Sequence, residues 1–420
     1  MASRTRRLFV VAAALLLSAC QPDRVISGWL TPPTNQAASA RPEALSAPPR
    51  SVSGWVPYWG TTASRSAITN RPSSIGDVTP LFYGTNNDGT LKLLGPQAQL
   101  DETIRVTRSD PGLVLFAGIF DSTGGGVMSG LLGDPTTRTF HVQQILDLAV
   151  SKGYDGIDLD YEVFAFDHPN EPWTLITPKW VAFVKELSAA LRTNNKLLSV
   201  TVPPVWNDGN SGYTVYAQDQ IAPFIDRLRL MVYDWSITNP GPIAPMNWVT
   251  NVMTYSEKFV PVAKLQLGVP TYGRHWITKK VTSETCPDGA LSRNSVLMKN
   301  IPTVTAGQTG VRDGSGELKF EWTSTVSGPR TKPLTPPVVP PSSIIIAEVN
   351  AAAAGSPLVP ALRLSTPSPF VTCTVQHTVY VPDAYSVDQR SDEAQRRGWR
   401  GIVMWAFGYE SSDLFDVLAS

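Results

Sequence analysis

A short acidic run, GYDGIDLDYE from Gly153 to Glu162, carries the residue types most able to do chemistry. Asp158, Asp160 and Glu162 alternate there with apolar residues. In a β-strand, residues two apart share a face, so these three carboxyl groups would point the same way. Like charges held close together raise some pKa values, and a raised glutamate pKa suits a general acid near neutral pH. We therefore predict that Glu162 donates a proton, with Asp160 and Asp158 in file behind it.

A divalent-cation site and an inert acidic network are the alternatives for this run. Calcium loops need flexible turns with their own spacing and a central glycine. A stiff Asp-x-Asp-x-Glu strand does not offer that arrangement. The sequence therefore favours catalysis by the carboxyl groups themselves, and we expect neither a metal nor another cofactor.

Eight strand-like segments, mostly near-continuous apolar runs, alternate with helical patterns along the chain. They are Ser53–Trp59, Asp77–Gly84, Gly112–Phe120, Tyr154–Glu162, Lys196–Pro204, Arg227–Asp234, Lys264–Gly273 and Arg400–Gly408. This alternation predicts an α/β fold, a (β/α)8 TIM barrel, with Glu162 nearest the C-terminal mouth where barrel active sites lie. A doubly wound open sheet is the alternative, but no glycine-rich phosphate loop follows the first segment. Between the strands, Gly153 is expected to follow one helix, and Pro178 to lie in the first turn of the next.

The spacing is regular except before the last strand, where residues 277–385 are too many for one βα unit. Strand-like stretches at 317–325 and 372–381 predict a small β-rich insertion between strands seven and eight. Cys286 and Cys373 both fall within it, and in an exported protein such a pair indicates a disulfide. Two buried thiols are the alternative.

The N-terminal residues predict export. Residues 1–20 combine three arginines with an apolar run, Leu8–Leu17, too short to span a bilayer, and end in Leu-Ser-Ala-Cys. That ending resembles a lipobox, which would make Cys20 the site of a lipid anchor in a membrane. An ordinary secretory signal is the alternative, and the arginines also resemble a twin-arginine signal. Residues 21–50, rich in Pro, Ala and Ser, would form a flexible tether to a domain at 51–420.

The composition bounds the class of protein. The chain has 420 residues, of which 42% are hydrophobic, so it can bury a large core. Lys+Arg and Asp+Glu are 35 each. This balance lacks the basic excess of nucleic-acid-binding proteins, so we expect no nucleic acid partner. We expect a monomer that acts outside the cytoplasm.

The acidic run also resembles a known signature. Asp155, Asp158, Asp160 and Glu162 complete the Asp-x-x-Asp-x-Asp-x-Glu pattern on strand four of glycoside hydrolase family 18, the chitinases and related N-acetylglucosaminidases. Further resemblances follow in order along the chain, at MVYD (231–234), GPIAPMNWV (241–249), LGVPTYGR (267–274) and the region of Trp405. The resemblance covers about residues 51–420 and implies the same barrel, often with an insertion between strands seven and eight.

The resemblance implies a substrate-assisted retaining mechanism, in which the nucleophile is the substrate's own 2-acetamido oxygen. Glu162 would protonate the glycosidic oxygen. Asp160 would orient the acetamide N–H, Asp158 would share a proton or charge with Asp160, and Tyr233 would donate to the acetamide oxygen. Substrate-binding positions implied by the family pattern are Asp155, Met231, Asp234, Tyr272, Arg274 and Trp405.

The implied substrate is a β-1,4-linked glycan that contains N-acetylglucosamine. The pattern is most similar to the branch that includes spore-germination and cortex-lytic enzymes. This similarity and the expected lipid anchor together favour peptidoglycan over chitin oligosaccharides as the substrate. A non-catalytic sugar-binding member of the family is the alternative, because some members are lectins that lack the acid. A structural wall-anchored protein with a vestigial site is the third hypothesis.

Overall fold

The computed structural model describes residues 51–70, 75–166, 171–207, 211–330 and 370–419. The predicted signal peptide, Cys20 and the tether lie outside these residues. Within the described ranges, no helix combines the length and the apolar character needed to cross a membrane.

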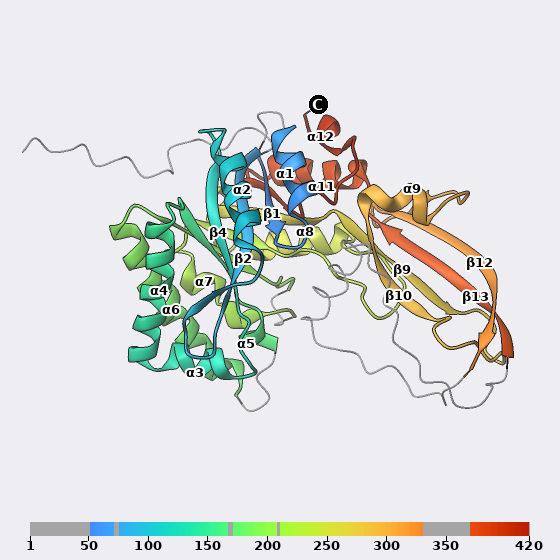
Figure 1. Ribbon diagram of the computed structural model, residues 1–420, viewed down its shortest axis with the longest axis horizontal. Helices are drawn as coiled ribbons and strands as arrows, with labels where there is room; N and C mark the ends of the chain where they lie inside the picture. The colour runs from blue at the N-terminus through green and yellow to red at the C-terminus, as the bar shows by residue number, and fades with distance from the viewer. Residues whose placement is uncertain (1–50, 71–74, 167–170, 208–210, 331–369, 420) are drawn as a thin grey trace, which may run out of the picture. The chain divides into compact units, whose positions relative to one another are not determined.

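Eight parallel strands close into a barrel, as predicted (Figure 1). They are β1 (Val52–Pro57), β2 (Ile75–Thr85), β4 (Val114–Phe120), β5 (Gly156–Asp160), β6 (Leu197–Val202), β7 (Arg227–Leu230), β8 (Leu265–Pro270) and β14 (Gly401–Trp405). The pairing runs β1-β14-β8-β7-β6-β5-β4-β2, and β2 returns to β1 to close the ring. The short β3 (Leu91–Leu93) adds to β2 in the antiparallel sense. Each of the eight segments expected from the sequence coincides with one of these strands; β1 begins one residue before its segment, and β2 extends beyond its segment at both ends.

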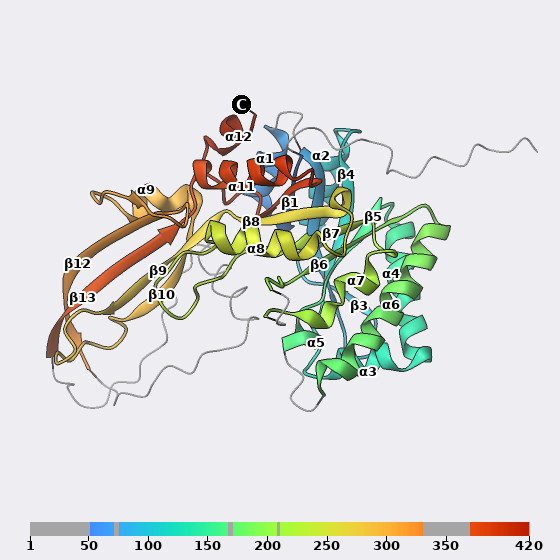
Figure 2. The same cartoon turned by 180° about the vertical axis from the view of Figure 1, so that it is seen from behind.

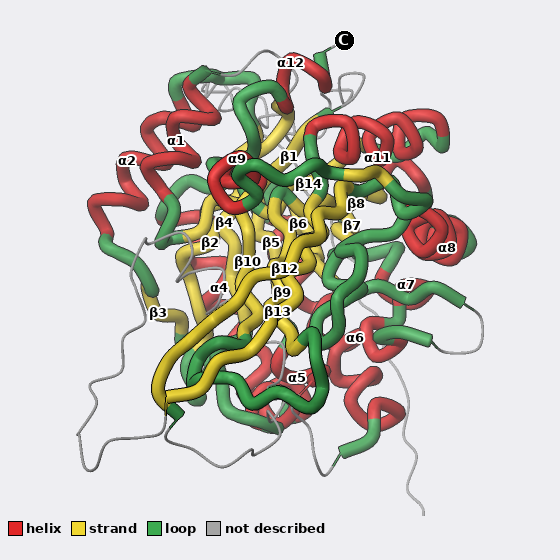
Figure 3. The backbone as a smooth tube through the Cα atoms, turned by 90° about the vertical axis from the view of Figure 1, so that its right-hand side faces the viewer, coloured by secondary structure: helices red, strands yellow, loops and turns green. Residues whose placement is uncertain are grey.

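Helices follow the strands and lie around the barrel (Figure 3). They are α1 (Thr61–Thr69), α2 (Gln97–Arg108), α3 (Val127–Gly133), α4 (Pro135–Ser151), α5 (Val163–Phe166), α6 (Trp173–Thr193), α7 (Gln218–Ile221), α8 (Met246–Ser256), α11 (Ala384–Arg396) and α12 (Leu414–Leu418). Gly153 follows α4 with a φ of 68°, the left-handed turn that glycine tolerates. Pro178 lies inside α6 rather than in its first turn, because the helix begins at Trp173 and already buries Ile176.

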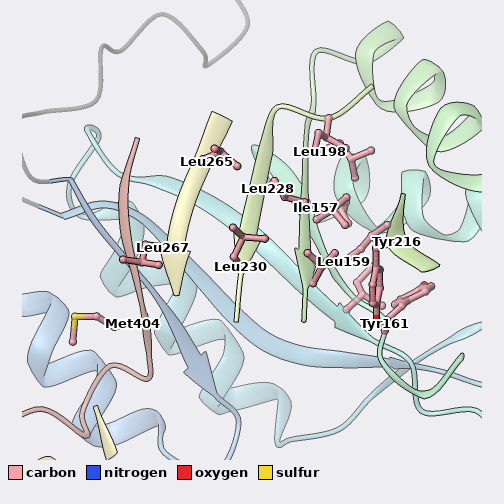
Figure 4. Packing of buried hydrophobic residues seen from close by; sticks show 14 of the residues in the cluster. Ile157, Leu159, Tyr161, Leu198, Tyr216, Leu228, Leu230, Leu265, Leu267 and Met404 are labelled. Atoms are coloured by element: carbon pink, nitrogen blue, oxygen red, sulfur yellow. Dashed lines mark hydrogen bonds between the residues drawn. The ribbon is translucent and has the colours of Figure 1, made fainter. Parts of the chain in front are cut away.

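The two faces of the barrel strands differ in chemistry. Ile157, Leu159 and Tyr161 belong to one large buried cluster, shown with Leu198 and Tyr216 in Figure 4. The residues that alternate with them on β5 are Asp158 and Asp160. The apolar face therefore packs in the core, and the other face carries the acidic residues.

The predicted insertion is a second sheet between β8 and β14. Its order is β10-β9-β13-β12-β11, all antiparallel. The elements are β9 (Tyr272–Lys279), β10 (Ser292–Leu297), α9 (Ile301–Val304), β11 (Val311–Arg312), β12 (Leu318–Pro329) and β13 (Phe370–Val381), with the long strands visible in Figure 2. The sheet starts at Tyr272, five residues before the expected boundary, because β9 begins almost directly after β8. Cys286 and Cys373 form the predicted disulfide, with an S–S distance of 2.09 Å.

A buried ion pair attaches the insertion to the barrel. Glu317, just before β12, accepts hydrogen bonds from the backbone N–H groups of Ile243 (2.8 Å) and Ala244 (2.7 Å). Arg390 of α11 lies 3.2 Å from the same carboxylate, and both side chains are buried. A buried carboxylate with these partners fixes the loop after β7 against the sheet.

Candidate active site

The three carboxyl groups of the acidic run lie at the C-terminal end of β5. Asp158 and Asp160 are within the strand, whereas Glu162 follows it in the turn before α5. Asp121, at the end of β4, accepts a hydrogen bond from the Phe164 N–H (3.0 Å) and donates its own N–H to the Asp160 carbonyl oxygen (3.3 Å). These two bonds hold the turn that presents Glu162.

Glu162 lies in an environment that favours its protonated form. Burial raises the pKa of Glu162 to about 7, with further contributions from the negative charges of Asp234 and Asp121. Desolvation and like charges both disfavour the ionised carboxylate. A carboxyl group with this pKa can give up a proton and take one back near neutral pH.

Asp160 is buried directly behind Glu162 in the strand. Asp160 is only 5% exposed, and its Oδ1 has no hydrogen-bond partner among the described residues. Burial raises the pKa of Asp160 well above its usual value, and the charges of Glu162 and Asp158 raise it further. A buried oxygen without a partner is costly unless a ligand supplies the missing donor.

Asp158 has donors from three other strands. Arg229 Nη1 lies 2.8 Å from Asp158 Oδ2, and Trp55 Nε1 donates to the same oxygen over 2.9 Å. Thr201 Oγ1 lies 3.1 Å from Oδ1. The expectation that Asp158 shares a proton or charge with Asp160 did not include Arg229, with which Asp158 forms a fully buried ion pair.

Tyr233 and Asp234 follow β7 beside this carboxyl file. Arg274 of β9 donates to Asp234 Oδ1 over 2.8 Å, and Asp234 has a left-handed backbone with φ of 61°. Such a conformation is uncommon for a residue with a side chain and is typical of functional sites. Burial and the surrounding carboxylates, Asp160 first, raise the pKa of Tyr233, so its hydroxyl stays protonated. Tyr272 packs edge-on against Tyr233, with ring centroids 6.2 Å apart.

A cavity of about 240 Å³ opens over Glu162. Three tryptophans line it and contact one another: Trp206 lies 5.9 Å from Trp235 and 6.0 Å from Trp248, and Trp235 lies 5.1 Å from Trp248, between ring centroids. The other lining residues are Phe166, Pro203, Pro204, Tyr213, Met231, Tyr233, Asp234 and Ile237. Half of the twelve lining residues are therefore aromatic, and the carboxyl groups of the cavity are those of Glu162 and Asp234.

A second aromatic group lies around Trp405 at the end of β14. Trp405 is 5.8 Å from Trp55 and 6.3 Å from Trp59, between ring centroids. It shares a buried cluster with Tyr272, against which Tyr233 packs. Tyr233 thus contacts this group and also lines the cavity.

Asp155 is the member of the expected site that the structure does not bring there. It precedes β5, at the opposite end of the strand from Glu162. Its carboxylate accepts the Leu115 N–H (2.8 Å) and pairs with Arg108 (2.7 Å). The expectation that Asp155 binds substrate is therefore wrong, because Asp155 does not lie at the C-terminal end of β5. A carboxylate at the N-terminal end of a barrel strand serves stability.

Several residues of the site were missed in the sequence. Asp121 directly follows the apolar run of β4, in the stretch FDST. A polar residue at the C-terminal end of a barrel strand indicates a site residue. Arg229 could have been found from the RLRL alternation, which places it on the same face as Arg227. The three tryptophans of the cavity had no such signal, because they come from separate loops and from α8. Among the described residues, no group of three His, Cys, Asp or Glu is placed to hold a metal ion.

Solved structures of other proteins share this fold. A chitinase from Chromobacterium violaceum ATCC 12472 has a TM-score of 0.65 and 19% sequence identity, covering 88% of this chain and 98% of that one. The Bacillus cereus spore cortex-lytic enzyme SleL has a TM-score of 0.63 and 16% identity, covering 88% of this chain and 73% of that one. At these identities the likeness establishes the barrel fold and not the activity.

Curated relatives match in sequence over part of the chain. YdhD of Bacillus subtilis, whose name describes a sporulation-specific glycosylase, is 30% identical over 168 residues, 38% of this chain and 38% of that protein. Chitotriosidase-1 of Mus musculus is 27% identical over 167 residues, 34% of this chain and 35% of that protein. The chain spans about two fifths of the length of these relatives. The family model "Glycosyl hydrolases family 18" matches residues 54–410, which is most of the chain, and the chain therefore belongs to glycosyl hydrolases family 18.

Proposed function

We propose that the protein is a retaining glycoside hydrolase that cleaves β-1,4-linked glycan containing N-acetylglucosamine. The observation that carries this proposal is the position of Glu162, which lines the aromatic cavity with its pKa raised to about 7 by burial. Such a group can protonate a leaving oxygen and then, as a base, activate the water that follows. Glu162 is the catalytic acid and base of this proposal.

The placement of Asp160 supports substrate assistance. Retaining enzymes with two catalytic carboxylates hold them about 5–5.5 Å apart, flanking the scissile bond. Asp160 instead lies behind Glu162 on the same strand face and is almost fully buried. It is therefore suited to accept the N–H of the substrate's 2-acetamido group, with Asp158 behind it, and not to attack the anomeric carbon.

The nucleophile is then the acetamide carbonyl oxygen, which attacks the anomeric carbon as Glu162 protonates the departing oxygen. The Tyr233 hydroxyl donates a hydrogen bond to that carbonyl oxygen and positions it. Water opens the resulting oxazolinium ring, returning one proton to Glu162, so the configuration is retained. The flanking residues proposed to line the sugar subsites are Met231, Asp234, Tyr272, Arg274 and Trp405.

Peptidoglycan is the substrate we favour, with chitin oligosaccharides next. The disulfide between Cys286 and Cys373 fits an oxidising, extracytoplasmic compartment. The proposed lipid anchor at Cys20 would hold a monomeric enzyme at the membrane, facing the wall. The names of YdhD and SleL, which refer to sporulation and to the spore cortex, point the same way.

The test is to incubate the purified protein with chitin oligosaccharides and with peptidoglycan glycan strands, and to identify the products by mass spectrometry. The wild type should cleave at least one of them. Glu162→Gln should cleave it about 10²–10⁴ times more slowly, because a general acid usually contributes a factor of that size. Asp155→Asn is the matched control, because it removes a carboxyl group of the same signature outside the site. It should keep its turnover number.

The outcomes separate the hypotheses. Cleavage of glycan strands alone would establish peptidoglycan, and cleavage of chitin oligosaccharides alone would reverse our preference. Binding without cleavage by the wild type would support a sugar-binding, non-catalytic protein. Equal activity of the wild type and Glu162→Gln would reject the proposed mechanism.

A further inference from the structure

Beneath Asp160, the barrel contains a row of alternating buried charges. Arg227 of β7 pairs with Asp77 of β2, which also lies 2.5 Å from Arg229 Nη2. Arg229 pairs in turn with Asp158, and each of these four side chains is at most 3% exposed. The row thus contains two cations and two anions, in the order Arg227, Asp77, Arg229, Asp158.

The guanidinium of Arg229 is fixed at every nitrogen. Besides its two ion pairs, Nη1 donates to Thr79 Oγ1 over 2.7 Å, and Nε donates to Gln266 Oε1 over 3.1 Å. These partners come from β2 and β8, on strands other than that of Arg229 itself. The cation therefore cannot turn away from Asp158 without losing several buried hydrogen bonds.

Asp158 has donors at both carboxylate oxygens. Oδ2 accepts from Arg229 and from Trp55, and Oδ1 accepts from Thr201. Hydrogen bonds and a cation both favour the ionised form of a carboxyl group. Asp158 thus already has a donor at each oxygen, whereas Asp160 Oδ1 has no partner among the described residues.

We propose that Arg229 is a positioning residue that holds Asp158 ionised, and thereby keeps the catalytic proton on the pair formed by Asp160 and Glu162 before the substrate arrives. This inference rests on the proposed function, because it assigns the proton that Glu162 delivers to the leaving oxygen. With Arg229 in place, Asp158 does not compete for that proton.

The charges around the pair agree with this assignment. On the side of the mouth, Glu162 is near Asp121 and Asp234, and the charge of Asp234 is paired with Arg274. Three tyrosine hydroxyl groups on which the charge of Glu162 acts, those of Tyr213, Tyr216 and Tyr233, are neutral because burial raises their pKa values. The cations Arg227 and Arg229 lie on the opposite side, beyond Asp158. Anions are therefore the charges near the Asp160–Glu162 pair, and of the three carboxyl groups in the file Arg229 pairs with Asp158.

The experiment compares pH profiles of kcat/KM for the full-length wild type, Arg229→Met and Arg229→Lys. Loss of the cation leaves Asp158 without its ion-pair partner, so the proton can spread over three carboxyl groups. Arg229→Met should therefore lower the maximum of kcat/KM by about tenfold or more, and its alkaline limb should move to higher pH. Arg229→Lys, which keeps the charge, should restore most of the maximum and return the limb towards its wild-type position.

Two controls separate positioning from folding. Thr201→Val removes an uncharged donor to Asp158, so its alkaline limb should move much less than that of Arg229→Met. The double variant Arg229→Met/Asp158→Asn removes the competing carboxyl group together with the cation, and its limb should return towards the wild-type position. A lowered melting temperature of Arg229→Met with an unmoved limb would overturn the proposal and leave Arg229 a structural residue.

A measurement without substrate keeps the proposal testable if Arg229→Met does not fold or if no glycan is cleaved. Infrared spectra of the full-length wild type and of Asp158→Asn, both with isotope-labelled aspartate, are subtracted at pH 6. If Asp158 is ionised in the wild type, Asp158→Asn should lack one ionised carboxylate band that the wild type has. Loss of a protonated carbonyl band would overturn the proposal, whatever the outcome for glycosidase activity.

Discussion

Arg274 donates a hydrogen bond to Asp234 over 2.8 Å, and this contact joins the first strand of the insertion to the loop that flanks Glu162. Asp234 is one of the charges that raise the pKa of Glu162, after burial itself. The insertion therefore contributes to the electrostatics of the site through one ion pair, although it carries none of the carboxyl groups of the acidic run.

The pH dependence of the enzyme should reflect Glu162. Because the acid must be protonated in the free enzyme, kcat/KM should fall as the pH rises through about 7, the pKa of Glu162. Asp234→Asn removes a neighbouring negative charge and leaves Arg274 without this carboxylate. Both changes lower the pKa of Glu162, so the alkaline limb should move to lower pH by about half to one unit. The measurement is the pH profile of kcat/KM.

Asp155→Asn is the control for this shift, since it makes the same chemical change at the other end of β5. Its alkaline limb should coincide with that of the wild type. Its melting temperature should fall, because Asp155 accepts the Leu115 N–H and pairs with Arg108. If Asp155→Asn moved the limb as far as Asp234→Asn, the local electrostatic explanation would fail.

Tyr233→Phe should lower kcat with a smaller effect on KM. The hydroxyl of Tyr233 is proposed to hold the acetamide oxygen while that oxygen attacks, and loss of one such donor costs about 10²–10³ in rate. Tyr161→Phe is the matched control, because the Tyr161 hydroxyl bonds to His141 on the other face of the strand (2.7 Å). Steady-state kinetics should show kcat of Tyr161→Phe within a few-fold of the wild type. A kcat loss of the same size in both variants would remove the proposed role of Tyr233.

The barrel and its acidic strand could be predicted because their signals are local. Alternation at Asp158 and Asp160 places both residues on one face whatever the rest of the chain does. The role of Asp158 was harder to predict, because its partner Arg229 lies 71 residues away and meets it only after the barrel closes. Asp155 was misplaced for a related reason: the signature is continuous in sequence, but a strand separates its two ends in space. The contact among Trp206, Trp235 and Trp248 depends on the two connections that follow β6 and β7, which local patterns do not position.

Trp235 should contribute to the binding of a sugar ring in the cavity that it lines. It is 48% exposed, lines the cavity, and packs against Trp248. An exposed indole face offers a flat apolar surface for a sugar ring. Trp235→Ala should lower kcat/KM on oligosaccharides about tenfold, which corresponds to about 1.4 kcal/mol. Phe370→Ala, at a 74% exposed aromatic residue of the insertion, should leave kcat/KM unchanged. Equal losses in the two variants would contradict a specific subsite.

The disulfide should stabilise the insertion and, through β9, the site. Cys286 and Cys373 are 87 residues apart, and the chain-entropy model gives such a bridge roughly 4–5 kcal/mol. The double variant Cys286→Ala/Cys373→Ala should therefore unfold at lower denaturant concentration and be cleaved faster by protease within the insertion. Cys373 lies on β13, which pairs with β9, the strand of Arg274. A loosened sheet should weaken the Arg274–Asp234 contact and raise KM.

Cys20→Ser is the control for the loss of a cysteine and should unfold like the wild type. Treatment of the wild type with a reductant should reproduce the double variant, and should have no further effect on the double variant itself. An unchanged denaturation midpoint in the double variant would mean that the antiparallel pairing of β12 with β13 and of β13 with β9 holds the sheet without the bridge.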